Sequence, residues 1–172
     1  MSFPSHQSAA LPDLGPATGL AILGFRAHVF GDVDCCCVRS GYGAAFGPEA
    51  EHALADLLLL ARLVGSEGQR RVALSAPGCL HMTRDEVSLA CALTAAQAWD
   101  DRALAAHLES LLGAPAGDAL KTLATRIADT FAGHGLAFEA PADARGVPEA
   151  QTPAFHLAGD AGAGAAARWP RA

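Results

Sequence analysis

Three consecutive cysteines, Cys35–Cys37, form the most unusual group of reactive side chains in this sequence. Thiolates are soft ligands that suit zinc, Cu(I) and iron–sulfur clusters. Adjacent side chains, however, point in different directions on a helix and to opposite faces on a strand. We therefore expect these thiols to behave as small apolar packing residues that do not converge on one ion, and we predict no cofactor.

A metal site would have to draw ligands from elsewhere, because the chain contains no C-x-x-C pair of the kind that zinc sites use. Cys79 and His81 lie two residues apart and offer such ligands. In the alternative hypothesis these two residues join Cys36 and Cys37 in holding zinc or another thiolate-bound metal. The protein would then be a metal-binding or redox-sensing protein.

Cys79 also precedes a predicted helix start. A thiol at a helix N-terminus gains nucleophilicity when its pKa is lowered. Cys79 stands four residues ahead of Thr83, the expected cap, and most of the helix-dipole effect is lost over that distance. A cysteine-nucleophile enzyme is therefore a weaker alternative. We assign no catalytic residue and expect that the protein is not an enzyme.

The neighbouring acids Asp85 and Glu86 belong to a helix-start signal and not to an acid–base site. In Thr83-Arg-Asp-Glu, the threonine hydroxyl accepts from the third backbone N–H of the helix, and Glu86 reaches back to the Thr83 N–H. This arrangement is a capping box. Asp32 and Asp34 are interpreted in the same way, as turn residues. We therefore expect no convergent pair of carboxylates.

Apolar residues that recur every three to four positions predict the helices that must carry these groups. Residues 19–30 fit a helical face better than an alternating strand. The fold class is therefore mainly α, a compact bundle of about five or six helices with at most a small two-stranded β element. The other expected helices cover 48–64, 83–98, 101–112 and 118–132, and the two expected strands cover 72–74 and 136–138.

Composition predicts one folded domain between two less ordered ends. The chain has 172 residues, of which 51% are hydrophobic and 17% charged, which suits a single core. Prolines and small polar residues indicate a flexible N-terminus over 1–17. From residue 140 onward the chain is rich in Ala, Gly and Pro and lacks bulky residues that would offset the ordering entropy. We expect a helical domain over 18–139 and a disordered tail over 140–172.

Charge and cysteine content limit the partners and the compartment. A formal net charge of -6 repels nucleic acid and anionic membranes on average, so neither is an expected partner. No apolar stretch reaches about 18 residues, and the N-terminus lacks the basic-then-apolar pattern of a secretory signal. Five cysteines, an odd number, favour reduced thiols in the cytoplasm over a disulfide framework.

The helices expected over 48–64 and 83–98 are apolar around most of their circumference. A domain of this size cannot cover both completely, and exposed apolar surface marks contact sites. The preferred hypothesis is a small cytoplasmic accessory or regulatory protein that contacts a protein partner or its own copies, as a homo-oligomer. No small-molecule ligand is indicated. The apolar stripes predict five core residues: Leu57, Leu58, Val87, Leu93 and Ile127.

Overall fold

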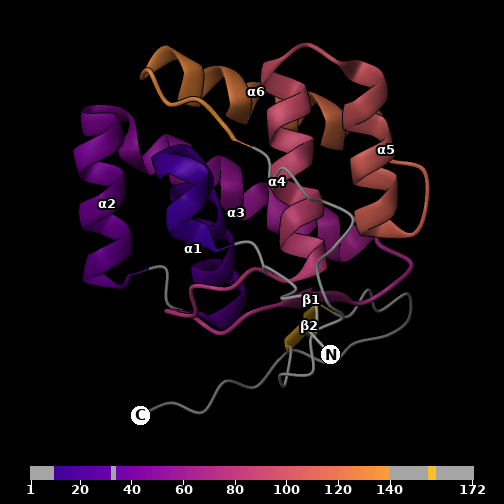
Figure 1. Cartoon of the computed structure of the whole chain (residues 1–172), viewed down its shortest axis with the longest axis horizontal. Helices are drawn as coiled ribbons and strands as arrows, with labels where there is room; N and C mark the ends of the chain where they lie inside the picture. The colour runs from indigo at the N-terminus through magenta and orange to yellow at the C-terminus, as the bar shows by residue number, and fades with distance from the viewer. Residues whose placement is uncertain (1–9, 32–33, 140–154, 158–172) are drawn as a thin grey trace, which may run out of the picture.

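The computed structural model describes residues 10–31, 34–139 and 155–157, which form a mainly helical fold, as predicted (Figure 1). Residues 1–9 of the predicted flexible N-terminus lie outside this description. No helix of the described part has the length and hydropathy needed to cross a membrane. The described elements are η1 (Leu11–Leu14), α1 (Gly15–Phe30), α2 (Cys36–Phe46), η2 (Gly47–Glu49), α3 (Ala50–Glu67), β1 (Val72–Leu74), α4 (Arg84–Gln97), α5 (Asp101–Leu112), α6 (Asp118–Gly133) and β2 (Phe155–Leu157).

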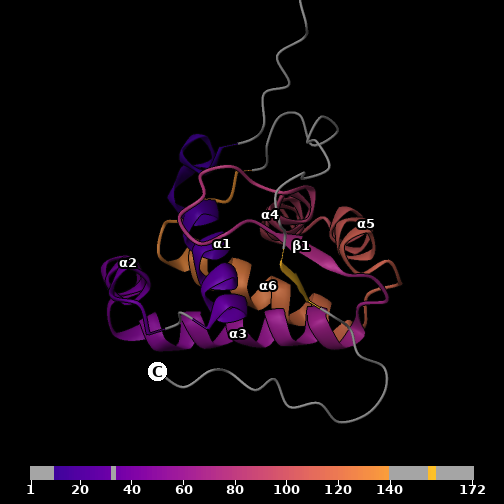
Figure 2. The same cartoon turned by 90° about the horizontal axis from the view of Figure 1, so that it is seen from below.

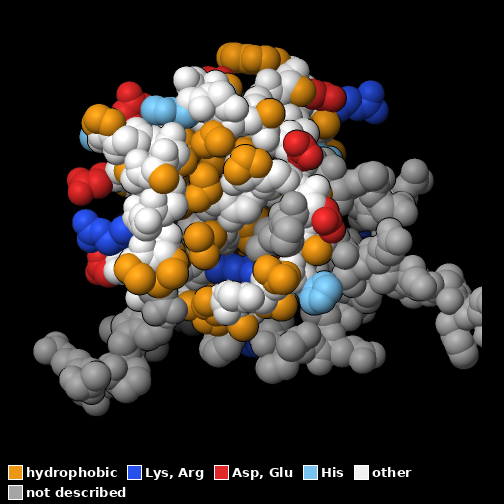
Figure 3. Space-filling view, turned by 60° about the vertical axis from the view of Figure 1, so that its left-hand side comes forward, with side chains coloured by type: hydrophobic (Ala, Val, Ile, Leu, Met, Phe, Trp, Pro, Cys, Tyr) orange, Lys and Arg blue, Asp and Glu red, His pale blue; other side chains and the backbone are white. Residues whose placement is uncertain are grey.

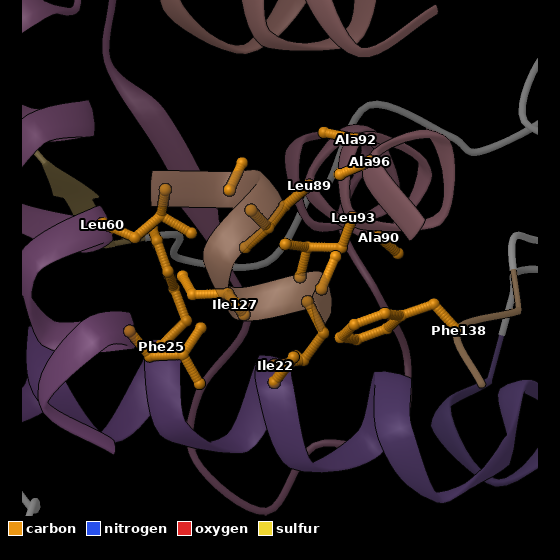
Figure 4. Packing of buried hydrophobic residues seen from close by; sticks show 14 of the residues in the cluster. Ile22, Phe25, Leu60, Leu89, Ala90, Ala92, Leu93, Ala96, Ile127 and Phe138 are labelled. Atoms are coloured by element: carbon orange, nitrogen blue, oxygen red, sulfur yellow. The ribbon is translucent and has the colours of Figure 1, made fainter. Parts of the chain in front are cut away.

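The core lies where α1, α3, α4 and α6 meet (Figure 2). Figure 4 shows Ile22 of α1 pointing toward Leu93 of α4, with Ile127 of α6 beside them. Four of the five predicted core residues are buried. Leu58 is the exception and is only half-buried. It lies on the flank of α3, next to the buried stripe that contains Leu57, because only one side of α3 packs against the bundle.

α1 begins earlier than the domain limit that the sequence predicts at residue 18. The helix starts at Gly15, and Pro16 occupies its first turn, where the missing N–H of proline costs no hydrogen bond. Leu14 and Ala17 are both buried. These apolar contacts extend the ordered domain toward the N-terminus, and residues 19–30 are helical as expected.

β1 does not pair with residues 136–138, the second strand that the sequence predicts. The side chain of Gln97 binds that segment instead: Nε2 donates to the Leu136 carbonyl at 3.0 Å, and Oε1 accepts from the Phe138 N–H at 2.8 Å. β1 pairs antiparallel with β2. Three residues of the predicted disordered tail therefore form a strand, and the rest of 140–172 lies outside the described residues.

A buried ion pair joins α1 to the start of α4. Arg26 is 1% exposed and Glu86 is 0% exposed, and Arg26 Nε lies 2.6 Å from Glu86 Oε1. Further Arg26 donors reach the carbonyl oxygens of Cys79 at 2.6 Å and His81 at 3.0 Å. Glu86 also completes the predicted capping box with Thr83. The loop between β1 and α4 is therefore fixed by both helices.

α2 is a helix that the sequence analysis does not predict, because cysteines and glycines interrupt its apolar pattern. Its buried side chains, Val38, Tyr42 and Phe46, recur every four residues. The Tyr42 hydroxyl donates to the Leu20 carbonyl of α1 at 2.9 Å. Glycine is required at position 24, because an added Cβ would overlap this hydroxyl. α2 is therefore anchored to the side of the bundle (Figure 1).

Candidate functional site

Cys35, Cys36 and Cys37 come together at the N-terminus of α2. Their sulfur atoms all lie within 4.8 Å of one another, and all three residues are exposed. The expectation that adjacent thiols do not converge does not hold here. Cys35 is the N-cap residue, with φ -56° and ψ 131°, whereas Cys36 begins the helix. The change in backbone conformation at a helix start breaks the regular geometry on which that expectation rests.

The spacing of the three sulfur atoms suits a single soft metal ion. Thiolates that surround one ion at about 2.3 Å lie about 4 Å from one another. Sulfur atoms that lie within 4.8 Å of one another are close to that spacing. In the part of the chain that the structure describes, no fourth Cys, His, Asp or Glu joins the cluster. A bound ion would therefore keep a coordination position open to solvent.

The start of α2 favours a thiolate at Cys35. The backbone N–H of Cys37, followed by that of Val38, lowers the pKa of the Cys35 thiol below its ordinary value. The pKa of Cys37 is raised, chiefly by its side-chain hydrogen bond with Cys35. Cys35, near the positive end of the helix dipole, therefore loses its proton at a lower pH than Cys37. A metal ion that binds all three sulfurs must displace the remaining protons.

Cys79 and His81 lie in the loop before α4, which Arg26 holds through their backbone. Their carbonyl oxygens accept hydrogen bonds from Arg26. The convergent cluster contains Cys36 and Cys37 but neither of these two residues. The convergent cluster therefore lies entirely at the start of α2 and differs from the four-residue set of the metal hypothesis. The spacing of these residues along the sequence does not distinguish the three-cysteine cluster from the four-residue set.

Asp85 and Glu86 are both bound to groups that hold the fold. The capping interpretation is confirmed for Glu86, whereas Asp85 binds Arg70 and the backbone of β1. The Asp85 carboxylate accepts from Arg70 Nη1 at 3.1 Å and from the Ala73 N–H at 2.6 Å. The Glu86 carboxylate accepts from the Thr83 N–H at 2.8 Å. Because structural donors occupy both carboxylates, this pair is not arranged for acid–base chemistry.

A second feature lies in the corner between α2 and α3, where the surface is hollowed by a cavity of about 440 Å³. Tyr42, Leu54 and Leu58 form part of its apolar wall, and Asp34 and Glu51 contribute acidic groups. The sequence analysis missed this cavity because half-buried leucines on a helix show the same periodicity as core leucines.

Comparison with known proteins adds no further guide. The chain matches no protein-family model, no curated protein and no solved structure.

Proposed function

We propose that this protein binds a soft, thiophilic metal ion through Cys35, Cys36 and Cys37. The observation that supports the proposal is the convergence of three exposed sulfur atoms at one helix N-terminus. Zinc and Cu(I) are the ions whose ligand preferences fit a set made only of thiolates. A reducing compartment such as the cytoplasm would keep the three thiols free for binding.

The proposed ion is exchangeable, because the site differs from a structural zinc site in two ways. Structural sites are closed, with four protein ligands, whereas this cluster offers three ligands that face solvent. In addition, α2 is held by its own buried side chains, Val38, Tyr42 and Phe46. The fold therefore does not depend on the ion. This favours a role in acquiring, carrying or sensing the metal.

Metal titration of the reduced, metal-free protein under anaerobic conditions tests the proposal. Native mass spectrometry should detect one zinc or Cu(I) ion per chain. Replacement of Cys35, Cys36 and Cys37 together by serine should abolish this binding. Cys79→Ser is the matched control, because it removes one thiol outside the cluster and should leave the stoichiometry unchanged. Equal metal binding by the triple-serine variant and the wild type would refute the proposal.

Contact with a protein partner, or between copies of the chain, is the second candidate function, and Trp99 supports it. This residue is 72% exposed and has a positive φ of 57°, a backbone conformation that costs energy for a bulky residue. Exposed tryptophans are frequent centres of binding energy at protein interfaces. If copies of the chain associate through it, Trp99→Ser should lower the molar mass measured by light scattering. A mass equal to that of the wild type oligomer would count against self-association through Trp99.

A further inference from the structure

The cavity between α2 and α3 has the size and lining of a small-molecule site. Its volume of about 440 Å³ falls within the range of about 300–1,000 Å³ that is typical of ligand pockets. The lining extends from Asp34, just before α2, to Gly47, just after it. The cavity therefore runs along the whole of α2, a helix about 17 Å long at 1.5 Å per residue.

The wall of this cavity is apolar at its centre. Leu54 and Leu58 of α3 are half-buried and line it together with Tyr42. The Tyr42 hydroxyl already donates to the Leu20 carbonyl, and the residue is only 1% exposed, so the tyrosine closes the base of the cavity and offers no free hydrogen-bonding group. Figure 3, which brings the α2 side forward, shows hydrophobic side chains over the middle of that side of the molecule, with a basic group among them lower down. An apolar ligand body fits such a wall.

The charged groups that line the cavity determine which sign of charge a ligand should carry. Arg39 Nη1 lies 3.3 Å from Asp34 Oδ1, so these two charges are paired. Glu51 also lines the cavity, and among the described residues it has no ion-pair partner. One acidic charge is therefore available to a ligand. The net charge of -6 adds a field that attracts cations and repels anions.

We propose that the cavity between α2 and α3 binds a small organic cation, in which an aromatic or aliphatic body carries an ammonium group. The body packs against the half-buried Leu54 and Leu58, above the buried Tyr42, and the ammonium group pairs with Glu51. A second copy of this chain is a poor occupant, because it brings the same negative charge to the same place. The proposal is independent of metal binding, since none of the three clustered cysteines lines the cavity.

Three probes with one skeleton test the proposal: tryptamine, the neutral alcohol tryptophol and the anion indolepropionate. Two-dimensional NMR titration of the full chain gives both the affinity and the location of each probe. Tryptamine should bind most tightly and indolepropionate most weakly. The shifted amide signals should belong to α2 and the first half of α3. An equal affinity for the amine and the acid, or shifts confined to other helices, would overturn the proposal.

Two matched charge variants separate a local ion pair from general attraction. Glu51→Gln should weaken tryptamine binding about fivefold and leave tryptophol binding unchanged. Glu109→Gln removes the same charge from an exposed position on α5 and should leave both affinities unchanged. An equal loss of tryptamine binding in both variants would show that only net charge matters, which contradicts the assigned site.

A filling variant tests the apolar part of the site. Ala55 lines the cavity and is exposed, so a larger side chain can be placed there without disturbing the core. Ala55→Phe should weaken the binding of all three probes, and the NMR spectrum will show whether the fold is retained. Undiminished tryptophol binding in a folded Ala55→Phe variant would overturn the proposed location.

Discussion

Arg26 and Glu86 contact each other at two points across the core, with Arg26 Nε 2.6 Å from Glu86 Oε1 and Nη2 2.8 Å from Oε2. Both side chains are almost completely buried. Charges removed from water in this way need full hydrogen bonding to be tolerated. Within the described residues, no buried side-chain nitrogen or oxygen lacks a hydrogen-bond partner. The pair is therefore fully hydrogen-bonded, and it holds α1 against the start of α4.

Breaking this pair on one side should strongly destabilise the fold. Arg26→Met leaves the Glu86 carboxylate buried without its counter-charge, and we expect a loss of about 3–5 kcal/mol in the free energy of unfolding. Arg39→Met is the control, because it removes an exposed pair and should cost less than about 1 kcal/mol. Urea unfolding measures both. Similar losses in the two variants would contradict the role assigned to Arg26.

The Thr83 hydroxyl should contribute measurably to stability. It accepts from the Glu86 N–H and donates to the Ala73 carbonyl at 2.7 Å, which links the start of α4 to β1. Thr83→Ala should lower the free energy of unfolding by about 1–2 kcal/mol. Thr83→Ser keeps the hydroxyl and should retain most of that stability. Equal losses in these two variants would mean that the threonine methyl, and not the cap, matters.

At position 99, relief of backbone strain should stabilise the fold by more than the loss of the tryptophan side chain destabilises it. The left-handed conformation of Trp99 costs about 1–2 kcal/mol for a residue with a Cβ, and the exposed side chain buries little surface. We expect Trp99→Gly to raise the free energy of unfolding by up to about 1 kcal/mol, after the entropic cost of glycine. Trp99→Ala should show no such gain. A clear loss of stability in Trp99→Gly would mean that the indole ring packs in a way that this account misses.

The thiols should differ in the pH at which they react. The thiolate is the reactive form, and the pKa of Cys35 is lowered by backbone N–H groups. Alkylation of Cys35 by iodoacetamide should therefore reach its half-maximal rate at a lower pH than alkylation of Cys37, whose pKa is raised. Cys91 should also require a higher pH than Cys35, because it is buried and burial raises its pKa. Tandem mass spectrometry of the alkylated peptides gives the order, and a reversed order for Cys35 and Cys37 would contradict it.

The sequence predicts most of the helical fold because helix starts and apolar periodicity are local signals. The capping box from Thr83 to Glu86 is an example that the structure confirms. The pairing of Arg26 with Glu86 could not be predicted, because it joins residues 60 positions apart and a capping glutamate shows no sign of a second partner.

The candidate sites were harder to predict than the helices. Convergence of Cys35–Cys37 depends on a helix that begins at Cys36, with Cys35 as its N-cap residue. The apolar periodicity of α2 is interrupted by cysteines and glycines, so the sequence gives no clear signal for that helix start. The cavity depends on how α2 packs against α3, which brings Asp34 and Tyr42 to the same hollow as Glu51 and Leu58. Periodicity locates faces of a helix but does not fix the angle at which two helices meet.

X-ray absorption spectroscopy of the zinc-loaded protein tests the central claim most directly, because it counts the sulfur atoms around the ion. We expect three sulfur ligands at about 2.3 Å and one lighter ligand from solvent. The same measurement on Cys37→Ser should show fewer sulfur ligands. A wild-type spectrum with no sulfur ligands, or one that is unchanged in Cys37→Ser, would contradict a metal site built from Cys35, Cys36 and Cys37.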